Sequence, residues 1–301
     1  MELAQQLING LSLGSIYALI ALGYTMVYGV LRFINFAHGD VLMIGAFAGY
    51  YLAPKMHEIF GRWGTLPVGV AVLVAAMAVC ALLGVLIEFF AYRPLRKHAR
   101  LTVLITSIGV SLLLEYGGQI LFGVNVKPFP DLLPPVRLSL GFGLSVSSNH
   151  LVALGVSGVL LLGLRFLVLY TRFGMAMRAL SQNRDAAALM GVNTNAVISL
   201  TFATGSALAG AGGILYALNV HSIDPLMGIL PGIKAFVAAV LGGIGSLPGA
   251  ALGGLLLGMV ESLIGGSSIS SYRDAVAFGI LILILLLRPA GLLGKSMPEK
   301  V

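Results

Sequence analysis

The chain has 301 residues, of which 58% are hydrophobic and only 10% are charged. Soluble domains carry about 25% charged residues, so this composition excludes an ordinary soluble protein and predicts an integral membrane protein. The net charge of +7 would fit a nucleic-acid partner, but the basic residues are scattered and no aromatic residues alternate with them. We therefore expect no nucleic acid to bind.

Apolar runs recur along the whole chain at roughly the 20-residue length that crosses a bilayer. We predict spans near residues 7–30, 34–53, 66–90, 101–122, 151–170 and 196–218, a glycine-interrupted pair near 229–243 and 249–264, and a last span near 275–287. The predicted fold class is all-α, a polytopic integral membrane protein with about eight or nine membrane segments in a single domain, 1–301.

Lysine and arginine gather in alternate loops, at residues 93–100, at 172–184 and after 287. Short basic loops face the cytoplasm. All three clusters fall on one side if the spans alternate, which predicts a cytoplasmic segment at 171–195 and an external N-terminus. On the opposite side, residues 123–149 contain four prolines, which predicts a stiff loop without a helix.

Polar residues stand at the start of the second predicted span, where Asn35, His38 and Asp40 follow Arg32. A charge inside a bilayer costs roughly 3 kcal/mol on insertion scales, so such groups usually face a cavity or each other. If the span is helical from residue 34, Asn35 and His38 share a face. Two interpretations stay open, an anchor at the membrane interface and a gating role in a translocation pathway.

Glu115 lies deep in its predicted span, which makes it a functional candidate by default. Lys234 is the unplaced cation of the glycine-interrupted pair. We predict that Glu115 and Lys234 form an ion pair. The alternative is that each side chain reaches the membrane surface separately.

The segment 242–258 is dense in glycine and contains Pro248 beside Gly245. Interrupted membrane segments of this kind point to a transport pathway. Close helix packing would also explain the glycines, because small residues four apart let helices approach in lipid. The small-residue steps are Gly249–Gly253, Gly254–Gly258 and, in the first span, Gly10, Gly14 and Ala18.

The polar stretch at 171–195 interrupts the apolar pattern. Its alanines and leucines favour one short helix that ends at Gly191. A solvated connecting loop is the simpler interpretation. However, Asp185-Ala186-Ala187, followed after three residues by Gly191, resembles the first half of the EAA loop of ABC importer permeases, which docks on the ATPase subunit.

The Ile-x-Leu-Pro that forms the second half of that loop is absent from this chain. The same departure occurs in branched-chain amino acid permeases of the LivH type. The chain also resembles those permeases at residues 35–39, 234–236 and 242–250.

The resemblance implies a permease subunit in the bacterial inner membrane that works by alternating access. Its implied partners are a second related permease subunit, two cytoplasmic ATPase subunits, an external solute-binding protein and membrane lipid. ATP and Mg would be used by the ATPases, so we expect this chain to bind no cofactor or metal and to be no enzyme. The implied ATPase-coupling residues are Arg178, Asp185, Ala186, Ala187, Leu189 and Gly191.

The candidate translocation-pathway residues are Asn35, His38, Asp40, Glu115, Lys234, Gly245 and Pro248. Related permeases import urea or short amides, which leaves the substrate open. A stand-alone ion-coupled secondary transporter is the alternative of another class.

Overall fold

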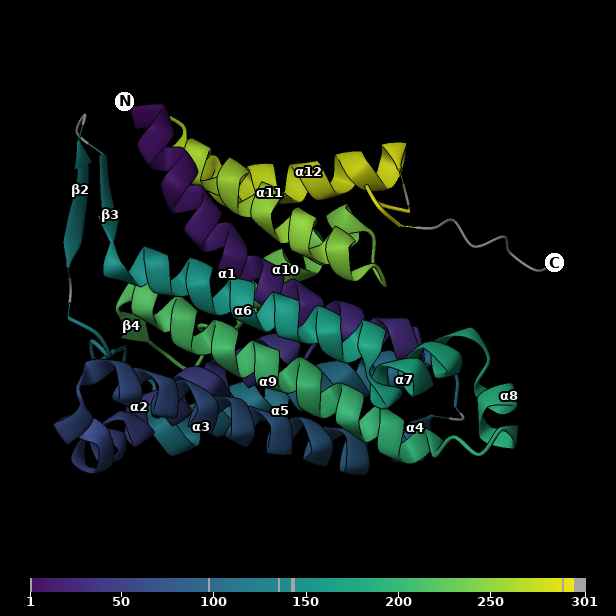
Figure 1. The fold of residues 1–301 in the computed structure, drawn as a ribbon. Coiled ribbons are helices and arrows are strands. Elements are labelled where there is room, and N and C mark those ends of the chain that lie inside the picture. The colour runs from purple at the N-terminus through teal and green to yellow at the C-terminus, as the bar shows by residue number, and fades with distance from the viewer. Residues whose placement is uncertain (1, 97, 135, 142–143, 289, 295–301) are drawn as a thin grey trace.

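The computed structural model describes residues 2–96, 98–134, 136–141, 144–288 and 290–294. Within them, seven helices are long and apolar enough to cross a membrane, and they lie side by side between two ends of the molecule (Figure 1). The helices in these spans are α1 (Glu2–Leu31), α3 (Thr65–Ile87), α5 (Arg100–Phe122), α6 (Ser148–Tyr170), α9 (Thr194–Val220), α11 (Leu247–Gly265) and α12 (Arg273–Leu287). The last span includes the 3-10 turn that directly precedes α12. Helix α3 continues through a π-helical turn, η2 (Glu88–Tyr92), into the short α4 (Arg93–Leu95).

One end of the molecule, which we call the hairpin end, carries the N-terminus and an antiparallel hairpin of β2 (Arg137–Gly141) and β3 (Leu144–Ser147) (Figure 1). Strands β1 (Lys127–Pro128) and β4 (Ser222–Ile223) also pair there. The short 3-10 turns η1 (Gly61–Trp63) and η3 (Ser270–Tyr272) complete the connections between helices. The described residues between α5 and α6 hold no helix, as predicted, although the sequence did not reveal their strands.

The opposite end, which we call the α8 end, carries α7 (Arg172–Gln182) and α8 (Arg184–Leu189) (Figure 1). The predicted single helix in this segment is wrong, because Asn183 divides it. The backbone at Asn183 is extended, with φ −151° and ψ 111°.

Two further helices, α2 (His38–Phe60) and α10 (Ile229–Gly242), begin inside the protein. The first residue of α2, His38, lies against Gly23 of α1. A methyl group built on Gly23 would clash with the His38 ring and lie 2.9 Å from the Gly205 carbonyl oxygen. Gly23 lies about 12 Å along α1 from Leu31, at a rise of about 1.5 Å per residue. Helix α2 therefore starts well inside the helix bundle, and its first turn contacts the first turn of α10 at Gly39 and Gly228.

This corrects the predicted span at residues 34–53. Residues 32–37, which we call the leg, form no helix, and Ala37 is the N-cap of α2. Asn35 and Phe36 therefore precede the helix, so the expected shared helical face of Asn35 and His38 does not exist. The cause is tertiary, because the Asn35 side chain accepts a hydrogen bond of 2.7 Å from the Tyr92 hydroxyl.

The order and direction of the elements reveal an inverted repeat, which the sequence did not show. Helices α1, α2, α3 and α5 correspond to α9, α10, α11 and α12, and each helix runs in the direction opposite to its counterpart (Figure 1). In both halves a long helix is followed by a non-helical segment and by a helix that starts inside the protein. The halves interlock, because α1 packs along α11 and α3 packs along α9.

Small residues form both of these interfaces. The sequence predicted this for α1 and α11 but not for α3 and α9. A methyl group on Gly14 would lie 2.8 Å from Leu255 Cα, and one on Gly254 would lie 2.5 Å from Ala18 Cα. In the α3–α9 interface, a methyl group on Gly210 would lie 2.8 Å from Cys80 Sγ. Apolar burial gives little drive for association in lipid, so close backbone contact stabilises these interfaces.

Candidate functional site

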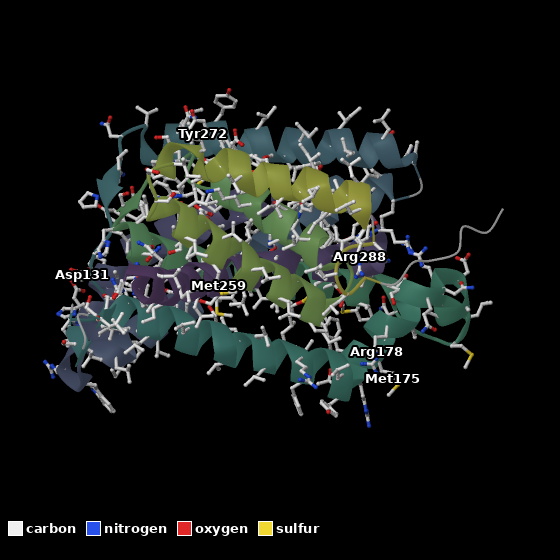
Figure 2. The ribbon with its side chains drawn as sticks, turned by 90° about the horizontal axis from the view of Figure 1, so that it is seen from above. Asp131, Met175, Arg178, Met259, Tyr272 and Arg288 are labelled. Carbon is white, nitrogen blue, oxygen red and sulfur yellow. The ribbon has the colours of Figure 1, made fainter. Side chains whose placement is uncertain are left out.

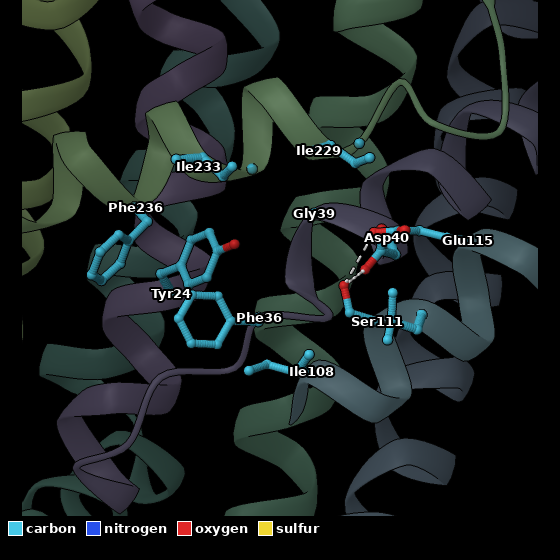
Figure 3. Close-up of a pocket in the computed structure, with 13 residues that line it drawn as sticks. Tyr24, Phe36, Gly39, Asp40, Ile108, Ser111, Glu115, Ile229, Ile233 and Phe236 are labelled. Carbon is cyan, nitrogen blue, oxygen red and sulfur yellow. Dashed lines mark hydrogen bonds between the residues drawn. The ribbon is translucent and has the colours of Figure 1, made fainter. Parts of the chain in front are cut away.

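A cavity of about 280 Å³ lies where α1, α2, α5 and α10 meet (Figure 3). Bulky apolar side chains form most of its wall, and four polar side chains join them. The apolar residues are Phe36, Ile108, Leu112, Ile229, Ile233 and Phe236, and the polar residues are Tyr24, Asp40, Ser111 and Glu115.

Three of the polar residues, Asp40, Ser111 and Glu115, form one connected group on α2 and α5. Ser111 Oγ lies 2.5 Å from Asp40 Oδ2, to which it donates a hydrogen bond, and 3.5 Å from Glu115 Oε1. Asp40 is only 2% exposed. No lysine, arginine or histidine is among the described residues that line the cavity, so the two carboxyl groups face it without a basic partner.

Glycines let the first turns of α2 and α10 meet at the cavity. A methyl group on Gly39 would lie 2.6 Å from the Gly228 carbonyl oxygen, and one on Gly232 would lie 2.8 Å from Gly39 Cα. The N-caps of α2 and α10 are Ala37 and Gly228, and neither end has a side-chain cap. Uncapped helix N-termini carry partial positive charge on their free N–H groups. The N-termini of α2 and α10 therefore lie together at this site.

Of the candidate pathway residues, Asp40 and Glu115 line this cavity. Asn35 and His38 lie behind it. His38 is 1% exposed, and its Nε2 finds no hydrogen-bond partner among the described residues. Gly245 lies in the turn between α10 and α11, with φ +94°, and Pro248 lies in the first turn of α11. Neither lines the cavity.

The predicted ion pair between Glu115 and Lys234 is wrong. Lys234 Nζ lies 2.7 Å from Glu261 Oε1 and 2.7 Å from Asp274 Oδ1. Consecutive helical residues are rotated by roughly 100°, so Ile233 can face the cavity while Lys234 faces α11 and α12. The Tyr17 hydroxyl donates to the second Glu261 oxygen at 2.9 Å, which ties α1 to the same cluster.

Sequence reasoning missed Tyr24, Ser111 and the three glycines of the cavity. Ser111 stands four residues before Glu115, a spacing that places both on one helix face, and this signal was available. Tyr24 and the glycines became visible only through contacts between separate helices.

Helix α8 is closed at both ends by local hydrogen bonds. Asn183 Oδ1 accepts from the N–H groups of Asp185 and Ala186, each at 3.0 Å. Gly191 has φ +84°, and the N–H of Val192 donates to the Ala187 carbonyl at 3.0 Å. This is a Schellman ending, so the prediction that Gly191 ends the helix is confirmed.

The candidate coupling residues differ in exposure. Leu189 is 88% exposed and Met190 is 85% exposed, while Asp185 and Ala186 are also exposed and Ala187 is buried. Arg178 donates to the Val168 carbonyl and so fastens α7 to α6. Figure 2 shows Arg178 with Met175 at the α8 end, far from Asp131 at the other end.

A chain of polar contacts joins the start of α9, next to α8, to the leg before α2. Asn195 accepts a hydrogen bond of 2.8 Å from Arg96, and Arg96 also pairs with Glu88, whose side chain is fully buried. Arg93 lies 2.8 Å from Glu88 as well. Burial lowers the pKa of Arg96 to about 10, with a smaller contribution from Arg184, so Arg96 is charged at neutral pH.

Glu88 and Tyr92 are the two ends of the π-helical turn η2. Since Tyr92 donates to Asn35, this turn connects the Glu88 cluster with the leg. Such turns often occur at functional sites. No group of three or more metal-ligating side chains occurs among the described residues.

Comparison with known proteins shows one consistent family. Residues 6–285 match the family described as branched-chain amino acid transport system / permease component. The chain is 43% identical to the high-affinity branched-chain amino acid transport system permease protein BraD of Pseudomonas aeruginosa, over 99% of this chain and 97% of BraD.

It is 42% identical to the permease protein LivH of Escherichia coli, over 99% of this chain and 97% of LivH. It is also 29% identical to a probable LivH of Methanocaldococcus jannaschii, over 93% of this chain and 89% of that protein. No solved structure gives a significant match. The chain is a polytopic helical membrane protein that belongs to the family of permease components of branched-chain amino acid transport systems.

Proposed function

We propose that this chain is the permease subunit of an ATP-driven importer that carries branched-chain amino acids across the bacterial inner membrane. The observation that carries the proposal is the cavity between α2, α5 and α10. Its apolar wall suits an aliphatic side chain, while the two carboxyl groups and the two helix N-termini suit the charges of an amino acid.

The proposed partners of this chain are a second related permease subunit, two cytoplasmic ATPase subunits and an external solute-binding protein. The ATPase subunits use ATP and Mg, and this chain supplies no catalytic group. Leu189 at the end of α8 and Met190 directly after it support docking of an ATPase, because large apolar side chains exposed to water mark interaction sites. The α8 end is then cytoplasmic, and the hairpin end meets the binding protein.

Movement of α8 would reach the cavity through the polar contacts already described. The path runs from Asn195 through Arg96 and Glu88 to Tyr92, and from there to Asn35 in the leg before α2. In this mechanism the ATPases move α8, and the leg moves the first turn of α2 at the cavity. The substrate passage thereby changes its access from outside to inside.

The test is uptake into proteoliposomes that hold the complete complex with its binding protein. We expect leucine, isoleucine and valine to accumulate only when ATP is present. Replacing both Leu189 and Met190 by serine should release the ATPases during purification, whereas replacing the exposed Met175 of α7 should not. Uptake of urea in place of leucine would contradict the proposal that branched-chain amino acids are the substrate. Uptake that persists without ATP and stops when the proton gradient is dissipated would establish a secondary transporter instead.

A further inference from the structure

The cavity holds two carboxyl groups that face no basic side chain among the described residues. Asp40 and Glu115 converge on Ser111 from two different helices, and neither forms an ion pair within the described residues. Asp40 in the first turn of α2 also complements the helix dipole, but that role does not account for Glu115, which lies on α5. Asp40 is buried and Glu115 is half-buried, and carboxyl groups this close need a cation nearby for both to be ionised.

Groups that favour an anion are present in the same cavity. Tyr24 of α1 is only 5% exposed, and its hydroxyl points into the cavity (Figure 3). That hydroxyl donates no hydrogen bond to any described residue, so a buried donor is free for a ligand. Beside it lie Gly39 and Gly228, at the uncapped N-termini of α2 and α10. A hydroxyl donor and two helix N-termini favour an anion.

The remaining wall is apolar and bulky. Phe36 and Phe236 lie on one side of the cavity with Ile108, and Ile229 and Ile233 project from α10 (Figure 3). These side chains leave room for a branched aliphatic group and offer it no hydrogen bond. The cavity therefore provides anionic groups, anion-binding groups and an apolar wall within one space.

We propose that this cavity is a binding site within the permease for an aliphatic α-amino acid as its zwitterion. Asp40 and Glu115 hold the ammonium group, while Tyr24 and the first turns of α2 and α10 hold the carboxylate. The apolar wall holds the side chain. The site deepens the proposed function and rests on it, and it gives the permease a selectivity of its own, separate from that of the binding protein.

The first experiment measures binding to the purified complex without its binding protein, in lipid nanodiscs, by equilibrium dialysis. The probes are radiolabelled leucine and three competitors that each lack one feature. These are 4-methylpentanoate without an ammonium group, 3-methylbutylamine without a carboxylate and glycine without the side chain. The native complex should bind leucine about tenfold or more tightly than each competitor, a difference of about 1.4 kcal/mol or more.

The second experiment assigns the two charges. Asp40→Asn and Glu115→Gln should each weaken binding of leucine and of 3-methylbutylamine by about tenfold and leave 4-methylpentanoate unchanged. Tyr24→Phe should weaken leucine and 4-methylpentanoate and leave 3-methylbutylamine unchanged. Glu58→Gln, an exposed carboxylate on the same helix α2, is the matched control and should change none of them.

These patterns separate recognition from a folding defect, because misfolding would weaken all ligands together. The site is overturned if the native complex transports leucine but Asp40→Asn and Glu115→Gln leave the ratio of leucine to 4-methylpentanoate affinity unchanged. It is also overturned if the transporting complex binds no leucine at millimolar concentration. If the native complex transports no aliphatic amino acid at all, the proposed function fails first and the site falls with it.

Discussion

Replacing Lys234 by methionine tests the buried ion cluster of α10, α11 and α12. The change leaves Glu261, only 4% exposed, with the Tyr17 hydroxyl at 2.9 Å and with Arg273 no nearer than 4.0 Å. Breaking a buried pair by removing one partner costs about 3–5 kcal/mol, because a charge is left buried without compensation. At about 2–4 °C per kcal/mol, the midpoint of thermal unfolding should fall by on the order of 10 °C.

The double variant Lys234→Met with Glu261→Gln provides the decisive comparison. It removes the stranded charge, and Asp274 is 49% exposed and remains hydrated, so most of the lost stability should return. The assay is thermal unfolding of the purified chain in detergent, followed by size-exclusion chromatography after heating. Lys55→Met, an exposed lysine of α2, is the control and should shift the midpoint little. If the midpoint falls in the double variant by the sum of its falls in the two single variants, the unpaired charge of Glu261 is not the cause of the instability.

Three further predictions concern packing, capping and coupling. Gly14→Leu should prevent folding, because the leucine side chain would enter the backbone of α11. The yield of monodisperse protein measures this. The control Gly109→Leu should fold, because no atom lies within 4 Å of the Cβ position at Gly109. Asn183→Ala removes the N-cap of α8 and should lower the stability of this helix by about 1 kcal/mol. Hydrogen exchange at residues 185–190 should therefore accelerate. Unchanged exchange would contradict the role of the cap. Glu88→Gln should lower the leucine transported per ATP hydrolysed, whereas equal loss of both activities would indicate a general defect.

Local hydrophobicity was enough to predict the helical fold, since each predicted span overlaps one of the helices found. The predicted eight or nine membrane segments are slightly too many, because seven of the described helices are long and apolar enough to cross a membrane. It could not show that α2 and α10 start inside the protein. The sequence of the leg before α2 does not exclude a helix, and its non-helical structure depends on a contact with Tyr92, more than fifty residues away. The inverted repeat was hidden because its two interfaces use different small residues, glycines between α1 and α11 but Cys80 with Gly210 between α3 and α9.

The candidate site was predicted in part. Asp40 and Glu115 could be identified because a carboxyl group in an apolar run is unusual enough to require a reason. Their environment could not be predicted, since it depends on how each helix is rotated. Lys234 shows this clearly, because it lies one residue from Ile233 of the cavity and yet contacts a different cluster.

The leg before α2 also constrains how this protein is made. Its contacts come from later parts of the chain, since Phe33 stacks on Tyr92, and Tyr92 in turn packs against Phe202 of α9. Lipid cannot satisfy the polar backbone of a non-helical segment. While the ribosome is still synthesising the middle of the chain, the leg has no completed protein surface to enter. Insertion therefore cannot finish one helix at a time from the N-terminus, and the first half of the molecule reaches its final structure only after α9 has been made.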